Sequence, residues 1–242
     1  MFFLLICRKH KLIKMKKYIY ITTLLFSILS FGQQIFWYDV ILNIKPSNQK
    51  NVENLVDEYY SSFDFPENTS LDFSSIPLKG EGFTGTHILS FAAESANSLA
   101  KLRESLSGDQ WDLYIAEIQK YIVDARSSAG KSLITYNNNI RNFPIGQAWV
   151  FSVDDTNSFA DAFSKVMKTY KPDGFVGMGQ IVHGTSNGEN TYIYGTYKDL
   201  SSAFDFGPKN DEETKAFDLF FKETAKEYFS QSFTRVLIKK YE

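Results

Sequence analysis

The sequence predicts an α+β protein in which one β-α-β-β-α-β pattern occurs twice. Two observations predict it. Strand-like alternation and helix-like stripes of apolar residues follow each other in the same order in residues 33–141 and 142–242. The strands also carry apolar or aromatic residues on both faces, so each half must bury both faces of its sheet. The two halves are therefore expected to bury their open sheet faces against each other.

The first strand is predicted over residues 35–44, where alternate residues form two faces of different composition. One face is entirely apolar or aromatic: Phe36, Tyr38, Val40, Leu42 and Ile44. The other face is mixed: Trp37, Asp39, Ile41 and Asn43. The apolar face is expected to be buried against other apolar groups. Pro46 ends the strand, and an apolar stripe predicts a helix over residues 48–61.

The rest of the first half follows the same period rules. It is predicted to contain strands over 71–78 and 83–92, helices over 95–106 and 109–126, and a strand over 131–136. In the helix over 109–126, Trp111, Ile115 and Ile118 are spaced by four and three residues, which defines its buried face. Gly130 follows that helix and separates it from the last strand.

The second half repeats this order. It is predicted to contain strands over 147–153, 175–183 and 191–197, helices over 157–170, 200–204 and 211–230, and a final strand over 233–240. Identical residues give modest support to a duplication, because Thr86-His87-Ile88 matches Thr191-Tyr192-Ile193 at an offset of 105. Matching Trp37 to Trp149 gives 112 instead. Two unrelated domains that share a common pattern are the alternative.

A β-α-β-β-α-β unit is the ferredoxin-like arrangement, an antiparallel sheet with both helices on one face. Two such units make residues 35–241 resemble the duplicated form of the dimeric α/β-barrel superfamily, on element order and repeat alone. The resemblance implies two ferredoxin-like halves packed through their sheets as a pseudo-dimeric α/β barrel with a central cavity. Similar proteins include cofactor-independent monooxygenases of the antibiotic-biosynthesis type, haem enzymes and small-ligand proteins, and the fold does not choose among them.

The N-terminal segment is predicted to be an export signal that ends at residue 32. Lys16 and Lys17 precede an apolar stretch over 18–29, and Ser30 and Gly32 place small residues at a cleavage site. Met15 begins a complete signal and is expected to be the true start. An uncleaved membrane anchor is the alternative, although the 14 residues of 18–31 fall short of the roughly 20 that a span needs.

Cleavage would change the composition of the protein. The removed segment holds six of the 26 basic residues and none of the 28 acidic ones, which leaves 20 against 28 and a net charge of −8. Such a charge argues against nucleic acid and anionic membranes as partners. Cys7, the only cysteine, is also removed, so neither a disulfide nor a thiolate metal site is expected. The predicted product is a soluble monomer in the periplasm or the medium.

Two histidines, His87 and His183, are the obvious titratable candidates on predicted strands. Either could act as a general base or as a haem ligand if its side chain pointed into the cavity. A structural role for His87 and simple exposure for His183, at a strand end, are the alternatives. No metal site is expected, because two histidines are too few for a histidine-rich centre.

The mixed face of the first strand supplies the other candidates. Trp37 beside Asp39 would suit a flat aromatic ligand, and burial would raise the pKa of Asp39 so that it could act as acid or base. Tyr192 and Tyr194 share a predicted strand and would add hydroxyl donors to a cavity, with Trp149 as a further aromatic wall. Ordinary filling of the barrel by these rings is the alternative.

Glycines in predicted strands do not form a phosphate loop. Gly174, Gly177 and Gly179 have no helix N-terminus behind them and indicate instead that a bulky neighbour approaches the sheet. Three functions remain open. A small aromatic or apolar ligand bound between the halves, without a cofactor, is favoured. A cofactor-independent monooxygenase or isomerase using Asp39 or His87, or a haem enzyme, is the second. A structural protein of the cell envelope is the third.

Overall fold

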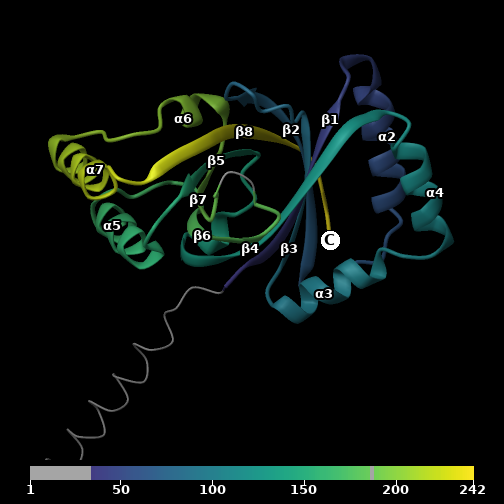
Figure 1. Ribbon diagram of the computed structural model, residues 1–242, viewed down its shortest axis with the longest axis horizontal. Helices are drawn as coiled ribbons and strands as arrows, with labels where there is room; N and C mark the ends of the chain where they lie inside the picture. The colour runs from purple at the N-terminus through teal and green to yellow at the C-terminus, as the bar shows by residue number, and fades with distance from the viewer. Residues whose placement is uncertain (1–33, 186–187) are drawn as a thin grey trace, which may run out of the picture. The chain divides into compact units, whose positions relative to one another are not determined.

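The computed structural model describes residues 34–185 and 188–242 (Figure 1). The predicted export signal, residues 1–32, lies outside the described residues. Within the described part of the chain, no helix is long and apolar enough to cross a membrane.

Residues 34–141 follow the predicted order of elements. They form β1 Phe36–Ile44, α2 Gln49–Tyr60, β2 Thr69–Lys79, β3 His87–Ala93, α3 Ala96–Ser105, α4 Asp109–Ile118 and β4 Ile122–Tyr136, with short 3-10 turns at Pro46–Asn48 and Asn138–Ile140. Residues 142–242 form β5 Ile145–Ser152, α5 Thr156–Thr169, β6 Val176–His183, β7 Thr191–Tyr197, α6 Leu200–Phe204, α7 Asp211–Glu223 and β8 Tyr228–Tyr241. Each part therefore reads β-α-β-β-α-β, as the sequence predicts.

The described strands close into one barrel, in the order β1-β3-β2-β8-β5-β7-β6-β4. Read in two parts, this is β4-β1-β3-β2 followed by β8-β5-β7-β6, which is the ferredoxin-like strand order twice. The parts meet through the antiparallel pairs β2–β8 and β4–β6, and these joins are equivalent under exchange of the two parts. Figure 1 shows α2, α3 and α4 on one flank of the barrel and α5 and α7 on the opposite flank. The predicted pseudo-dimeric α/β barrel is confirmed.

Two helices end earlier than the periodicity predicts. The helix predicted over 109–126 ends at Ile118, and the one predicted over 211–230 ends at Glu223. Each helix is followed by a short turn and then by a strand, β4 from Ile122 or β8 from Tyr228, whose first residues pair with β1 and β5. Apolar residues four positions apart, such as Ile118 and Ile122, lie on one face of a helix and also on one face of a strand. The apolar pattern alone therefore could not show where the helix ends and the strand begins.

The helices cover the outward faces of the strands with separate apolar clusters. On the first part, the apolar face of β1 packs against α2 through Leu42, Ile44, Val52 and Val56. Val52 and Val56 are fully buried, and each such side chain contributes about 1.5–3 kcal/mol to folding. A second cluster, which includes Phe159 of α5, covers the other part. The mixed face of β1 is therefore the one that faces the barrel interior.

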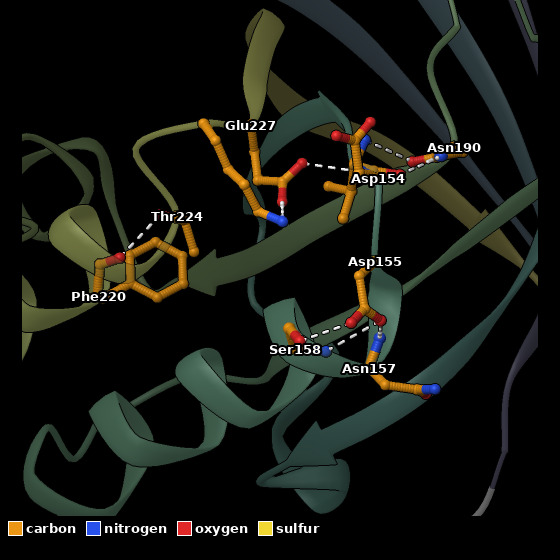
Figure 2. Close-up of polar contacts among 10 residues, drawn as sticks. Asp154, Asp155, Asn157, Ser158, Asn190, Phe220, Thr224 and Glu227 are labelled. Atoms are coloured by element: carbon orange, nitrogen blue, oxygen red, sulfur yellow. Dashed lines mark hydrogen bonds and ion pairs between the residues drawn. The ribbon is translucent and has the colours of Figure 1, made fainter.

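Polar contacts fix the start of α5 against β7 and β8. Asp155 is the N-cap of α5 and accepts hydrogen bonds from the backbone N–H groups of Asn157 and Ser158. Figure 2 shows Asn190 and Glu227 reaching the preceding segment from two other places in the chain. Asn190 exchanges two hydrogen bonds with the backbone of Val153, and Glu227 accepts one from the N–H of Asp154 at 2.8 Å. These contacts hold the end of β5 next to β7 and β8.

Candidate ligand cavity

The barrel encloses a cavity of about 210 Å³. Alternate residues of each strand point into it, as expected for a barrel. Its polar and aromatic wall includes Trp37, Asp39, Asp72, Ser90, Tyr192, Tyr194 and Arg235. Its apolar wall includes Ile41, Ile88, Ala148, Val150 and Phe233. The cavity is smaller than the roughly 300–1,000 Å³ of drug-sized ligand pockets, so it suits a small molecule.

Arg235 of β8 organises one part of the polar wall. Its Nε donates to the Tyr194 hydroxyl at 2.8 Å, and its Nη1 donates to Ser90 Oγ at 2.6 Å. Its Nη2 lies 3.5 Å from Oδ2 of Asp72, and the guanidinium carbon lies 4.8 Å from the centre of the Tyr194 ring. Four strands, β2, β3, β7 and β8, are thereby tied together inside the barrel.

Asp39 of β1 lies beside this arrangement. Burial raises the pKa of Asp39 to about 6, whereas the charge of Arg235 and the hydroxyl of Ser90 act in the opposite direction. The charge of Asp72 adds to the rise. The part of Asp39 that is not covered by protein faces the cavity. A carboxyl group with a pKa near neutrality, in contact with a cavity, can both give and take a proton.

Trp37 and Tyr192 form an aromatic pair on the cavity wall. The Trp37 indole N–H donates to the Tyr192 hydroxyl at 3.0 Å, and the two rings meet edge to face with centres 5.3 Å apart. Burial raises the pKa of Tyr192 well above its usual value, so this hydroxyl stays protonated. The pair joins β1 to β7 and gives the cavity an apolar surface with its polar atoms already satisfied.

Glycines create the room for the cavity side chains, as the sequence indicated for Gly179. A side chain at Gly179 of β6 would overlap the carbonyl oxygen of Lys131 and lie 2.6 Å from the Tyr192 hydroxyl. A side chain at Gly146 of β5 would overlap the Tyr194 hydroxyl and lie 2.9 Å from Nε of Arg235. These two positions allow large tyrosines to lie flat against the neighbouring strands.

A second polar group lies on another part of the cavity wall. Glu189 is 7% exposed and accepts hydrogen bonds from Ser230 and, at 2.8 Å, from Nε2 of Gln231. Arg126 donates to Oε1 of Gln231 at 3.3 Å, and its guanidinium carbon lies 4.4 Å from the centre of the Phe83 ring. This group is held together by hydrogen bonds among its own members.

Four of the predicted site residues meet in the cavity: Trp37, Asp39, Tyr192 and Tyr194. His87 is not among the lining residues, because its side chain packs between Phe73 of β2 and Glu53 of α2. It is 2% exposed, its ring is stacked on Phe73, and its Nε2 lies 3.7 Å from Glu53. Burial lowers the pKa of His87, against the opposing charge of Glu53, so a neutral structural ring is the outcome.

His183 and Trp149 also lie away from the cavity. His183 is exposed at the end of β6. Trp149 points outward from β5 and packs against Phe206, with ring centres 5.1 Å apart. The placement of these residues as cavity walls is therefore wrong. Alternation along the strands explains the error for Trp149. Odd-numbered residues face inward on β1, whereas even-numbered residues face inward on β5. The offset of 112 that matches Trp37 to Trp149 is even, so it matches an inward residue of β1 to an outward residue of β5.

The offset of 105 between the Thr-x-Ile motifs fails for the same reason. Ile88 lines the cavity from β3, whereas Ile193 of β7 packs outward against the helices. An odd offset therefore pairs an inward position with an outward one. The order of elements carries the similarity between the halves, and these identical residues do not.

Sequence reasoning missed Arg235, Asp72 and Ser90. The available signal was a charge of each sign inside an apolar strand pattern: Arg235 within FTRVLI and Asp72 within LDF. Charged residues in strand interiors are rarely buried unless they are paired. Nothing in the linear sequence showed which residues would be partners, because Asp72 and Arg235 are 163 positions apart.

Comparisons with known proteins identify the fold and no closer kinship. No family model matches the chain, and no curated protein matches it. Among solved structures, it is similar to a candidate monooxygenase from Fusobacterium nucleatum, with 13% identity and a TM-score of 0.59 over 88% of this chain and 95% of that one.

Two further structures are similar over comparable lengths. A candidate monooxygenase from Lactobacillus acidophilus shows 13% identity and a TM-score of 0.57 over 87% of this chain and 96% of that one. An anthrone oxidase-like protein shows 10% identity and a TM-score of 0.53 over 86% and 93%. At these identities the likeness shows a shared dimeric α/β-barrel fold alone.

Haem does not fit the residues of the cavity. The usual protein ligands of haem iron are histidine, cysteine, methionine and tyrosine. Neither described histidine lines the cavity, and Cys7 lies outside the described residues. The hydroxyls of Tyr192 and Tyr194 already accept hydrogen bonds from Trp37 and Arg235. We therefore derive no chemistry through a haem group.

Proposed function

We propose that this protein binds a small aromatic or apolar molecule in the cavity between the two halves of its barrel. The observation that carries the proposal is the composition of the wall, where the Trp37–Tyr192 pair lies beside the partly buried charges of Asp39, Asp72 and Arg235. Ligand sites typically combine apolar and aromatic surface with a few placed polar groups.

The aromatic pair and the apolar wall would supply most of the binding free energy. Burying apolar surface contributes about 25 cal/mol per Å², and an aromatic ring on Trp37 or Tyr192 gains a further 0.5–1.5 kcal/mol, roughly, from ring contacts. The polar groups would orient the ligand. Since the cavity holds about 210 Å³, a single substituted ring is the right size class.

Binding of 2-phenylethanol, followed by calorimetry and native mass spectrometry, tests the proposal. Ala148 lines the cavity, so Ala148→Phe should fill the space and abolish binding. Ala100 is exposed on α3, and Ala100→Phe should leave binding unchanged. Binding that survives in Ala148→Phe would place the ligand outside the cavity and contradict the proposal. So would a wild-type protein that binds no small aromatic molecule.

Proton-transfer catalysis is a second candidate, favoured by the pKa of Asp39. A carboxyl group with a pKa of about 6 is well matched to work as a general base near neutral pH. Asp39 would remove a proton from a carbon or hydroxyl of the ligand, as a cofactor-independent isomerase or oxygenase requires. His87 cannot share this role because it lies on the outer face of β3. Turnover unaffected by Asp39→Asn would exclude this candidate.

We also propose export with cleavage before Gln33. The support is the basic, apolar and small-residue order of residues 15–32. Intact mass measurement of protein recovered from the periplasm or medium should give a chain that starts at Gln33. Recovery of an uncleaved chain with the membranes would favour the anchor instead.

A further inference from the structure

The cavity wall carries three carboxyl groups and three guanidinium groups, but one part of it holds charges that do not balance among themselves. We call Asp39, Asp72, Ser90, Tyr194 and Arg235 the inner polar cluster. It holds two carboxyl groups and one guanidinium, so it carries one net negative charge when both carboxyl groups are ionised. Charges of this kind are costly to bury unless a partner compensates them.

Arg235 uses three of its five N–H donors within the cluster. Its Nε, Nη1 and Nη2 face Tyr194, Ser90 and Asp72, and the Tyr194 ring lies against the guanidinium. An anionic ligand that approached the guanidinium through these three N–H groups would have to displace Asp72 or one of the two hydroxyls. Each displaced buried group would lose a hydrogen bond.

Asp39 is the carboxyl group of the cluster that has no direct ion pair, although the charge of Arg235 acts on it at longer range. Among the described residues, no lysine, arginine or histidine nitrogen lies within 4.0 Å of its carboxylate, whereas Asp72 has Arg235 at 3.5 Å. The Ser90 hydroxyl accepts a hydrogen bond from Arg235 and is also the hydrogen-bonding partner of the Asp39 carboxyl group. The excess negative charge of the cluster therefore lies at Asp39, on the cavity wall.

Aromatic surface lies directly beside this carboxylate. Trp37 is two residues before Asp39 on β1, which places both side chains on the inward face. The Trp37 N–H is already bonded to the Tyr192 hydroxyl, so the pair offers a ligand ring surface and the hydroxyl hydrogen of Tyr192. A cation next to aromatic rings gains about 0.5–2 kcal/mol from the ring electrons.

From this geometry we infer that the cavity selects small aromatic amines, whose ammonium group pairs with Asp39 while the ring lies against Trp37 and Tyr192. The inference rests on the proposed function and names the ligand class of that same site. The raised pKa of Asp39 agrees with it, because an added cation would relieve the burial of the ionised carboxylate.

Two other arginines line the cavity and could bind an anionic ligand, which is the alternative that the experiment must test. Arg126 is engaged with Gln231 and the Phe83 ring, and Arg141 donates its Nε to the carbonyl oxygen of Asn138 at 3.1 Å. Both keep donors that a carboxylate could reach. An anionic aromatic ligand would therefore bind toward these residues and would not depend on Asp39.

Calorimetry with three probes of one shape separates these outcomes: 2-phenylethylamine, 2-phenylethanol and phenylacetate. At pH 8 the amine should bind about tenfold more tightly than the alcohol, because one hydrogen bond to a charged group changes affinity by about this factor. Phenylacetate should bind most weakly. Asp39→Asn should remove the advantage of the amine over the alcohol. Asp161→Asn, on the exposed surface of α5, should change neither.

The pH dependence of the wild type gives an independent readout. Asp72, Arg235, Tyr192 and Tyr194 are the titratable groups whose charges couple to Asp39. Asp39, whose pKa is raised to about 6, gains a proton between pH 8 and pH 5, so the preference for the amine should shrink over that range. This measurement does not require a variant to fold.

The outcomes distinguish failure of the inference from failure of the proposed function. If the alcohol or phenylacetate binds as tightly as the amine, the inference is overturned and ligand binding in the cavity stands. An amine preference that persists in Asp39→Asn overturns it as well. If none of the three probes binds, both proposals fall.

Discussion

Asp39 is the residue at which the barrel interior departs most from ordinary side-chain chemistry. Its carboxyl group faces a cavity and is surrounded by rings and by a charge pair that is already satisfied. Burial raises the pKa of Asp39 from 3.8 to about 6. The folded state therefore holds this proton more tightly than the unfolded state does between pH 4 and pH 6.

This shift predicts a pH-dependent stability difference for Asp39→Asn. Because the folded pKa lies above the unfolded one, ionisation of Asp39 costs the folded protein about 2–3 kcal/mol as the pH rises from 4 to 8. The variant has no such cost. The free energy of unfolding of Asp39→Asn, relative to that of the wild type, should therefore rise between pH 4 and pH 8 by up to the cost of ionising Asp39. Urea denaturation of both proteins at each pH measures this difference.

Asp161→Asn is the matched control for this measurement. Asp161 is exposed on α5, so its replacement should change stability by less than about 0.5 kcal/mol at either pH. An Asp39→Asn variant whose stability difference from wild type is the same at pH 4 and pH 8 would show that Asp39 has an ordinary pKa.

For single residues, the sequence predicted that Trp37 and Asp39 belong to the site but did not predict Arg235. Alternation along the first strand separated Trp37 and Asp39 from the apolar face, and that separation is confirmed. Arg235 could not be assigned in the same way, because its role depends on Asp72 and Ser90 on distant strands. Local pattern gives the face of a residue, whereas its partners depend on the order of strands around the barrel.

Among the elements, β6 shows how a strand interior is shaped to serve the cavity. Gly179 lies within this strand, next to Tyr192 of β7 and opposite Ser132 of β4. The absence of a side chain at Gly179 lets the tyrosine lie across the strand and reach Trp37. A strand normally loses stability from a glycine, and here the packing of the ring offsets that loss.

Gly179→Ala should therefore destabilise the protein by about 1–3 kcal/mol. The added methyl group would overlap the carbonyl oxygen of Lys131 and press on the Tyr192 hydroxyl, so either β6 or the ring must move. Gly80→Ala is the control, because its methyl group would meet only the carbonyl oxygen of Ser232 at 3.9 Å. Thermal unfolding of both variants measures the difference, and equal melting temperatures would contradict the role given to Gly179.

The order of elements was predictable, and their ends were not. Periodicity correctly placed β7 and α6, but it extended α4 and α7 into the strands that follow them. The same error occurs at the same place in both halves. At these points the chain gains more from pairing with a neighbouring strand, β1 or β5, than from another helical turn, and that gain depends on tertiary structure.

For the whole molecule, the decisive feature is closure of the barrel within one chain. The joins β2–β8 and β4–β6 pair strands that would otherwise be free edges of each half. Free edges promote association with other chains, and closure removes them. The pairing that single-unit proteins of this architecture obtain from a second subunit is supplied here by the second half of the same chain.

Closure predicts a monomer. Light scattering coupled to gel filtration should give the mass of one chain at all concentrations tested in the micromolar range, since no strand edge in the described barrel is left to pair. A stable dimer would show that another surface, outside the strand edges, drives association.

The inner polar cluster draws Asp39, Asp72 and Ser90 from the first half and Tyr194 and Arg235 from the second. In a dimer of identical subunits, every such residue would occur twice around the symmetry axis, and the two ends of a ligand would meet the same surroundings. One chain with two unlike halves presents each group once. A molecule held here would meet a distinct environment at each end, so the two unlike halves favour one orientation of the ligand over its reverse.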